Sequence, residues 1–269
     1  MKRVIYISIS LLLFITYLII PSVIYANSEY VSYSVKAILP ENQIDHNHSY
    51  FNLRVEPNDV QELQTEIFNN ENEDISVHLS VRNSSTNQNG VIVYEDTEMN
   101  DSNWLPQLTD MVTFEEETVV IPAGESKIVS ATLQVPDQRF DGEILGGLHF
   151  EKELTDDVDS EGVKINNKYA YLVGVVLSQN EEEVPVDLQL KEVKADIVNH
   201  RTANVISIEN TSPNIVEGLA IDVKIYKDKD QEPIKEKYQE HLNMAPYSTM
   251  DFVIDWDKKN RSRYISSRN

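Results

Sequence analysis

Three of the chain's eight glycines, Gly142, Gly146 and Gly147, lie close together in the stretch FDGEILGGLHF. A glycine-rich loop can hold phosphate groups when it opens a helix and carries a lysine after the glycines. Here the glycines are followed by the strand-like sequence LHF, and the motif GK[ST] is absent from the chain. We therefore expect a strand in which glycine allows a close approach of a neighbour, and no nucleotide site.

Two other groups have the residue types of a metal site. The acidic stretch DVDSEG starts at Asp157 like a calcium loop, but its twelfth position is Lys168 where a glutamate is needed. We interpret it as an acidic linker and leave weak calcium binding open. His46 and His48 would share one face of a strand, but the chain has no cysteine and its other histidines are scattered. We predict no metal or cofactor.

Catalytic motifs are equally scarce. The patterns GxSxG and HExxH are absent, and the carboxylates of residues 115–117 and 181–183 form charge runs of the kind that usually face solvent. A hydrolase with paired carboxylates remains an alternative, because such pairs are assembled in space rather than in sequence. We expect a protein that is not an enzyme.

The N-terminal residues indicate export. Lys2 and Arg3 precede a long apolar run and a cleavage-like end at Ala26, so residues 1–26 are predicted to be a signal peptide, with an uncleaved signal anchor as the alternative. Cleavage would change the formal charge from −22 to −24. Such acidity argues against a nucleic-acid partner. Without cysteine, an exported chain must be held together by core burial, and this pattern suggests a Gram-positive surface protein.

Strands are the elements that must position any site. Apolar residues alternate with polar ones at period two in four segments, and turn-forming clusters rich in Asn, Gly, Pro and Asp separate them. The alternating sets are Ile75–Val77–Leu79–Val81, Val129–Ala131–Leu133–Val135, Leu219–Ile221–Val223–Ile225 and Met250–Phe252–Ile254. No segment keeps a helical period, so the predicted class is all-β, with sandwich domains.

Two parts of the sequence repeat the same pattern of strands and turns. Residues 65–81 and 206–225 each give strand, Asn-rich turn and strand, and a proline-led turn into another strand follows each of them. Two sandwiches of one topology would produce this order. We place the boundary in the acidic, aperiodic stretch 153–165.

Longer stretches resemble the WxL-interacting protein family. Residues 33–57, 88–94 and 140–150 are similar to its peptidoglycan-binding domain, and residues 165–177, 190–226 and 242–254 to its host-binding domain. The resemblance implies two tandem immunoglobulin-like sandwiches, in domains 30–152 and 163–269. It further implies a cell-surface adhesion protein with peptidoglycan, WxL-domain surface proteins and host extracellular matrix proteins as partners. An alternative is a structural scaffold subunit of a surface complex, without direct glycan binding.

The family usually continues through a final strand, a transmembrane helix and a basic tail. This sequence stops after IDWDKKNRSRYISSRN, so we expect a truncated second domain and no C-terminal membrane anchor. For glycan contact we select polar and aromatic loop residues that a sandwich core does not need, because sugars stack on aromatic rings and bond to planar amides and carboxylates. These candidates are Asn42, Gln43, Asp45, Tyr50 and Asn89, and all are also suited to plain turns.

Overall fold

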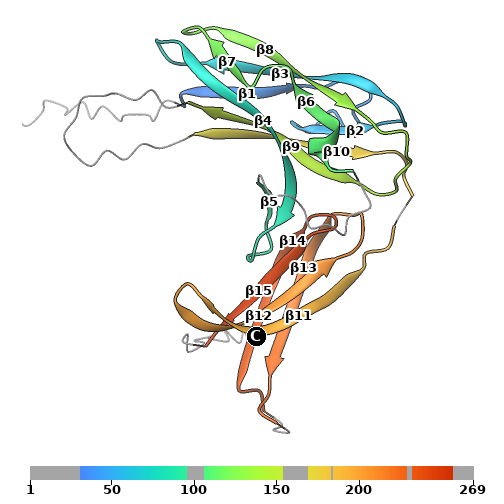
Figure 1. Cartoon of the computed structure of the whole chain (residues 1–269), viewed down its shortest axis with the longest axis vertical. Coiled ribbons are helices and arrows are strands. Elements are labelled where there is room, and N and C mark those ends of the chain that lie inside the picture. Colours follow the sequence, from blue (N-terminus) through green and yellow to red (C-terminus); the bar gives the residue numbers. More distant parts are fainter. Residues whose placement is uncertain (1–30, 96–105, 154–168, 183, 229–231, 257–269) are drawn as a thin grey trace, which may run out of the picture. The chain divides into compact units, whose positions relative to one another are not determined.

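The computed structural model describes residues 31–95, 106–153, 169–182, 184–228 and 232–256 (Figure 1). The predicted signal peptide, the calcium-like stretch at Asp157 and residues 257–269 lie outside the described residues. Two successive sandwiches of strands account for nearly everything described, which confirms the all-β, immunoglobulin-like class. Among the described residues, no helix is long and apolar enough to cross a membrane.

The first sandwich is built from two sheets. One sheet has the order β1 (Tyr33–Ile38), β3 (Val60–Asn69), β8 (Ser126–Gln134) and β6 (Val112–Phe114). The other has the order β2 (Phe51–Arg54), β10 (Ala170–Ser178), β9 (Ile144–Lys152), β4 (Ile75–Thr86) and β5 (Ile92–Glu95), and β7 (Thr118–Ile121) also pairs with β4. A short helix, α2 (Leu108–Met111), precedes β6.

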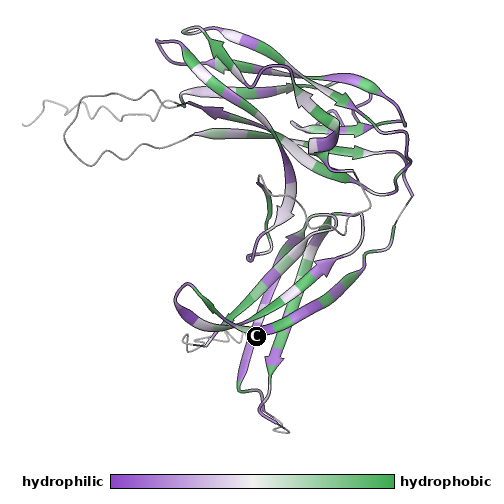
Figure 2. Cartoon of the chain, viewed as in Figure 1, coloured by the Kyte–Doolittle hydropathy of each residue, from purple (hydrophilic) through white to green (hydrophobic). Residues whose placement is uncertain are grey.

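Alternation along the strands produces the core between these sheets. Ile75, Val77 and Leu79 of β4 are buried, as are Ala131 and Leu133 of β8, while the residues between them are half-buried or exposed. Figure 2 shows how hydrophobic and hydrophilic residues alternate along the strands. Burial of the apolar face is the main force that holds the two sheets together.

The glycine stretch lies in β9, as the sequence predicts. A Cβ on Gly146 would lie 2.5 Å from Leu108 Cδ2 and 2.6 Å from the carbonyl oxygen of Arg82, and a Cβ on Gly147 would lie 2.9 Å from Leu172 Cγ. Glycine is therefore present because neighbouring chain segments approach closely.

The strand β10 pairs across the domain boundary expected from the sequence. It pairs antiparallel with β9 along residues 170–177 and parallel with β2 at residues 51–54, so it belongs to the first sandwich. The boundary at 153–165 and a second domain starting at residue 163 remain predictions, and a cut there would separate β10 from its neighbours β9 and β2.

The second sandwich is smaller. One sheet has the order β11 (Leu188–Val198), β12 (Arg201–Asn210) and β15 (Thr249–Asp255), and the other pairs β13 (Val216–Ile225) with β14 (Lys235–Met244). Asn199 and His200, with φ of 51° and 62°, form the two-residue turn between β11 and β12. Positive φ at both positions matches the turn type that suits the twist of a hairpin. Met250, Phe252 and Ile254 fill the core from β15.

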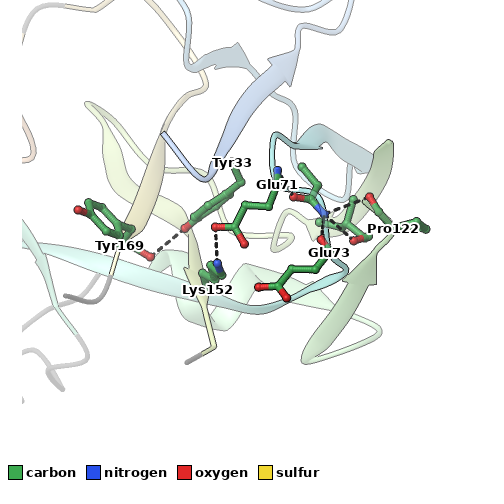
Figure 3. A network of polar contacts seen from close by, with 8 residues as sticks. Tyr33, Glu71, Glu73, Pro122, Lys152 and Tyr169 are labelled. Carbon is green, nitrogen blue, oxygen red and sulfur yellow. Dashed lines mark hydrogen bonds and ion pairs between the residues drawn. The ribbon is translucent and has the colours of Figure 1, made fainter. Parts of the chain in front are cut away.

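The internal resemblance has a structural counterpart in two buried asparagines, which we call the asparagine clamps. Asn69 ends β3, and its Nδ2 donates to the carbonyls of Glu73 (2.8 Å), Ile121 (3.0 Å) and Pro122 (3.1 Å), while its Oδ1 accepts from the N–H of Glu71. Figure 3 shows this group together with the ion pair of Glu71 and Lys152.

The second clamp repeats the first at the end of β12. Asn210 Nδ2 donates to the carbonyls of Asn214 and Ala245, both at 2.9 Å, and Asn210 Oδ1 accepts from the N–H of Ser212. In each clamp the asparagine side chain bonds to the backbone of the second and the fourth residue after it. The same side chain also bonds to the backbone of a proline-led turn that is distant in sequence. Both asparagines are fully buried.

Near the first clamp, Tyr33 joins β1 to the opposite sheet. Its hydroxyl donates to the carbonyls of Phe150 (2.7 Å) and Tyr169 (3.0 Å), and Figure 3 shows the bond to Tyr169. Burial raises the pKa of Tyr33 to about 12, so the hydroxyl remains a donor at any physiological pH.

Polar contacts join β4 and the turn after it to the second sandwich. The buried hydroxyl of Thr86 accepts from the N–H of Ala245 and bonds to Ser248 Oγ, and the carbonyl of Gly90 accepts from the N–H of Asn243.

Candidate functional site

An open pocket with a volume of about 360 Å³ lies on the side of the β2–β10–β9 sheet that faces away from the first core. Its volume falls within the range of about 300–1,000 Å³ typical of ligand sites. Two tyrosines, several aliphatic side chains and one carboxylate form its walls. The lining residues are Ser49, Tyr50, Ile92, Tyr94, Leu145, Leu172, Val173, Gly174, Val176, Ile215 and Glu217.

Two strands that are apolar on both faces create this pocket. On β10, Val175 and Leu177 belong to the first core, whereas the intervening Gly174 and Val176 line the pocket. Gly147 and Gly174 stand opposite each other on β9 and β10, and a Cβ on Gly174 would contact Tyr50 at an ordinary 3.6 Å. The missing side chain of Gly174 leaves the ring of Tyr50 accessible from the pocket.

Tyr50 and Tyr94 supply polar groups to an otherwise apolar wall. Within the described residues, neither hydroxyl has a hydrogen-bond partner, so both are available to a ligand. Burial raises the pKa of Tyr50, and the carboxylates of Glu143, Asp45 and Glu217 raise it further. Burial also raises the pKa of Tyr94. Both hydroxyls therefore stay protonated and can donate as well as accept.

The predicted ligand residues do not gather in this pocket, apart from Tyr50. Asn42 Nδ2 donates to the carbonyl of Arg54 and to Gln61 Oε1, both at 2.9 Å. Gln43 is buried; its Nε2 donates to the carbonyls of Asp45 and Tyr50, and its Oε1 accepts from the N–H of Asn52. These two amides fold the loop before β2 and thereby position Tyr50.

Asp45 and its histidine neighbour are also engaged locally. Asp45 Oδ1 accepts from the backbone N–H and the side chain of Asn47, and these bonds hold the pKa of Asp45 below its usual value. His48 Nε2 lies 3.8 Å from Asp45 Oδ2, and the ring of His48 stacks on that of Tyr50 with centroids 4.8 Å apart. Where the chain is described, no three His, Cys, Asp or Glu side chains form a metal-binding group.

Asn89 is exposed in the turn between β4 and β5 and does not line the pocket. Its N–H bonds to Asn87 Oδ1, and its carbonyl accepts from Gln239 Nε2 at 3.4 Å.

Sequence reasoning missed Tyr94, Leu172, Gly174 and Glu217. For Leu172 and Gly174 a signal was present, because the runs ILGGL and YLVGVVL are apolar at consecutive positions rather than at alternate ones. A strand of that kind is covered or used on both faces. The second apolar face of β9 and β10 is the one that lines the pocket.

A polar cluster lies on the face of β4 and β9 that points away from the first core. His149 Nδ1 is 3.3 Å from Ser80 Oγ, and burial lowers the pKa of His149, with Arg82 and His78 acting in the same direction and Glu151 opposing them. A lowered pKa means that the folded protein holds His149 neutral more strongly than the unfolded chain does.

This shift predicts a loss of stability in mild acid. As the pH falls below the usual value of 6.5 towards the lowered value, the unfolded chain takes up the proton first and is favoured. The urea midpoint should therefore fall between pH 7.5 and pH 5.5, and His149→Gln should reduce that fall. His46→Gln, at an exposed position, serves as the control and should leave the pH dependence unchanged. An NMR titration that gives His149 an unshifted pKa would contradict this account.

The fold and the pocket define a tandem β-sandwich protein with an open, ligand-sized pocket. The chain belongs to the WxL-interacting protein family. A family model described as "WxL Interacting Protein, peptidoglycan binding domain" matches residues 33–152, and one described as "WxL Interacting Protein, host binding domain" matches residues 160–263. The resemblance inferred from the sequence is thereby confirmed, with the domains in the expected order. No curated protein matches the chain.

Several solved structures have a similar fold. A chain of the chaperone–tip adhesin complex for CFA/I fimbriae is 12% identical over 86% of this chain and 94% of that chain, with a TM-score of 0.40. The class 5 fimbriae chaperone CfaA is 13% identical over 82% and 87%, with a TM-score of 0.39. A chain of the CsuC–CsuE complex of Acinetobacter baumannii is 12% identical over 77% and 86%, with a TM-score of 0.39. At these identities the likeness concerns the fold alone.

Proposed function

We propose that this chain is an exported, non-catalytic surface protein of a Gram-positive bacterium. Its first domain binds peptidoglycan, and its second domain binds a protein, either a WxL-domain surface protein or a host matrix protein. The descriptions of the two matching families support both assignments. The expected signal peptide, residues 1–26, would bring the chain to that location.

One observation carries the wall-binding half of this proposal: the hydroxyls of Tyr50 and Tyr94 lie in one open pocket without a protein partner among the described residues. Peptidoglycan presents sugar rings, acetamido groups and short peptides. Its rings and methyl groups match the aromatic and aliphatic walls, and its hydroxyls and amides match the tyrosine hydroxyls and the carboxylate of Glu217, which β13 of the second sandwich contributes to the pocket.

The test is co-sedimentation of residues 27–269 with purified Gram-positive cell-wall sacculi. Tyr50→Ala and Tyr94→Ala should each lower the affinity about tenfold, because each removes an aromatic wall and a hydrogen-bonding group. Tyr169→Ala is the matched control, since the Tyr169 side chain is exposed and only its carbonyl holds Tyr33. Each variant is first checked for an unchanged melting temperature.

Other outcomes identify the alternatives. Wild-type protein that does not sediment with the wall would favour the scaffold subunit, which has no glycan contact of its own. Wall binding that survives both tyrosine substitutions would place the wall contact outside this pocket. Soluble muropeptides that accumulate with time would contradict the non-catalytic assignment and favour a hydrolase.

A further inference from the structure

The second sandwich has four edge strands among the described residues. The strands β11 and β15 each pair with β12 alone, and β13 and β14 pair only with each other. The free edge of a strand carries backbone N–H and C=O groups that can pair with another strand.

Apolar side chains on the inner face of β11 are exposed beside these edges. Val193 stands opposite the buried Ile206 of β12, so its side chain lies on the core side of the sheet, yet it is 56% exposed. Leu190, opposite Ile208, is 66% exposed. In a complete sandwich such residues would be covered by the opposing sheet.

These residues form one side of a groove with a volume of about 560 Å³. Ile206 and Asn204 of β12 lie along it, and Val223 and Ile225 of β13 form its other side. Figure 2 shows the hydrophobic positions that recur along β11 and β13. The groove's apolar lining residues Val223 and Ile225 stand at alternate positions of β13 and so share one face of that strand, alternating with the polar Asp222 and Lys224.

The opposite edge of the same sandwich is protected. Lys237 of β14 points inward, with its Nζ 3.9 Å from the centre of the Phe252 ring and 2.9 Å from the carbonyl of Val253. Inward-pointing lysines are a common means of preventing a foreign strand from adding to an edge. Lys224 lines the groove between β11 and β13, but its Nζ bonds to Asp222 Oδ2 of its own strand at 2.9 Å rather than to the opposing sheet.

We propose that this groove accepts an extended segment of a partner protein, which adds to the free edge of β13 as a strand. Every second side chain of that segment is apolar and covers Val193, Ile206 and Val223. The proposal rests on the protein-binding role given above to the second domain and supplies its mode, which is pairing of main chains with apolar side chains in alternation.

Two other occupants fit less well. Residues 257–269 carry five basic side chains and one acidic one, and their only large apolar residues, Tyr264 and Ile265, are adjacent and would face opposite sides of a strand. A second copy of the chain brings the same formal charge of −22, which opposes self-association. A separate partner strand with lysines at its ends has neither problem.

The probe is a fluorescent synthetic peptide of the length of β13, in which valine and threonine alternate between terminal lysines. Residues 27–269 should bind it saturably, as measured by fluorescence anisotropy. Val193→Lys should weaken binding about tenfold or more, because the peptide's apolar face would then meet a charge. The control is Val120→Lys in β7 of the first sandwich, where the valine is similarly exposed (53%); binding should not change.

A second peptide separates strand pairing from apolar adhesion. Methylation of alternate backbone nitrogens removes the N–H groups that pair with an edge but keeps the side chains, so this peptide should not bind. Equal binding of both peptides, no binding of either, or no effect of Val193→Lys would overturn the proposal. So would a dimer in sedimentation, or peptide binding only after deletion of residues 257–269.

Wall sedimentation of the Val193→Lys protein is measured in parallel. Unchanged wall binding with lost peptide binding supports the groove, whereas lost wall binding with intact peptide binding would implicate Val193 in wall contact and overturn the assignment of that residue. Failure of wall binding in the wild type would affect only the function proposed for the first domain.

Discussion

Gly146→Ala should destabilise the first sandwich by about 2–4 kcal/mol. The added carbon would lie 2.5 Å from Leu108 Cδ2 and 2.6 Å from the carbonyl oxygen of Arg82. Leu108 is fully buried and the carbonyl belongs to the neighbouring strand β4, so neither can withdraw without disturbing the core. The shift is measured as the change in the urea midpoint of residues 27–269.

Gly174→Ala is the matched control, because this glycine also lies within a central strand. A Cβ there meets only Tyr50 at 3.6 Å, so we expect a change of about 0.5–1 kcal/mol at most, in either direction. If Gly146→Ala left stability intact but abolished wall binding, the glycine stretch would be a ligand site and not a packing feature.

The asparagine clamps should be the other large contributors to stability. Asn69→Ala leaves the carbonyls of Glu73, Ile121 and Pro122 without their shared donor, and a buried unpaired polar group costs about 1–3 kcal/mol. Since water can reach the outermost of these groups, we expect a total loss of about 2–4 kcal/mol. Asn210→Ala should act similarly on the second sandwich.

Hydrogen exchange followed by mass spectrometry distinguishes the two clamps. Asn69→Ala should speed exchange in β3 and β8, and Asn210→Ala should speed it in β12 and β15. Asn89→Ala, at an exposed turn position, is the control and should change neither. If exchange stayed at the wild-type rate in both clamp variants, the clamps would not contribute to the stability of these strands.

The sequence predicted best where one physical cause acts alone. Ile75–Val81 and Met250–Ile254 alternate because one face is buried, and both segments are strands in the structure. The pairing of β10 with β9 was not predicted, because the residues of β10 are apolar on both faces and period two therefore gave no signal for the sheet to which it belongs. Residues 153–165 lack a periodic pattern and therefore suggested a boundary, but the strands on either side of them, β9 and β10, pair with each other.

The candidate site was less predictable because polar side chains have two possible uses. Asn42 and Gln43 have the amides that a glycan would need, but those amides bond to the loop's own backbone. Nothing in the sequence indicated that Tyr94 lines a pocket. Its neighbour there, Tyr50, is distant in sequence, and the two tyrosines come together only when β2 and β5 have folded into the sheet.

The asparagine clamps also limit how the loops of this protein can diverge. Each clamp fixes the number of residues in the turn that follows it, because one side chain bonds to the second and the fourth residue after it. Those bonds use backbone atoms, so the clamps constrain the number of the intervening residues. Residues 70–73 and 211–214 should therefore reject insertions or deletions. Grafting a new recognition sequence there would have to preserve loop length.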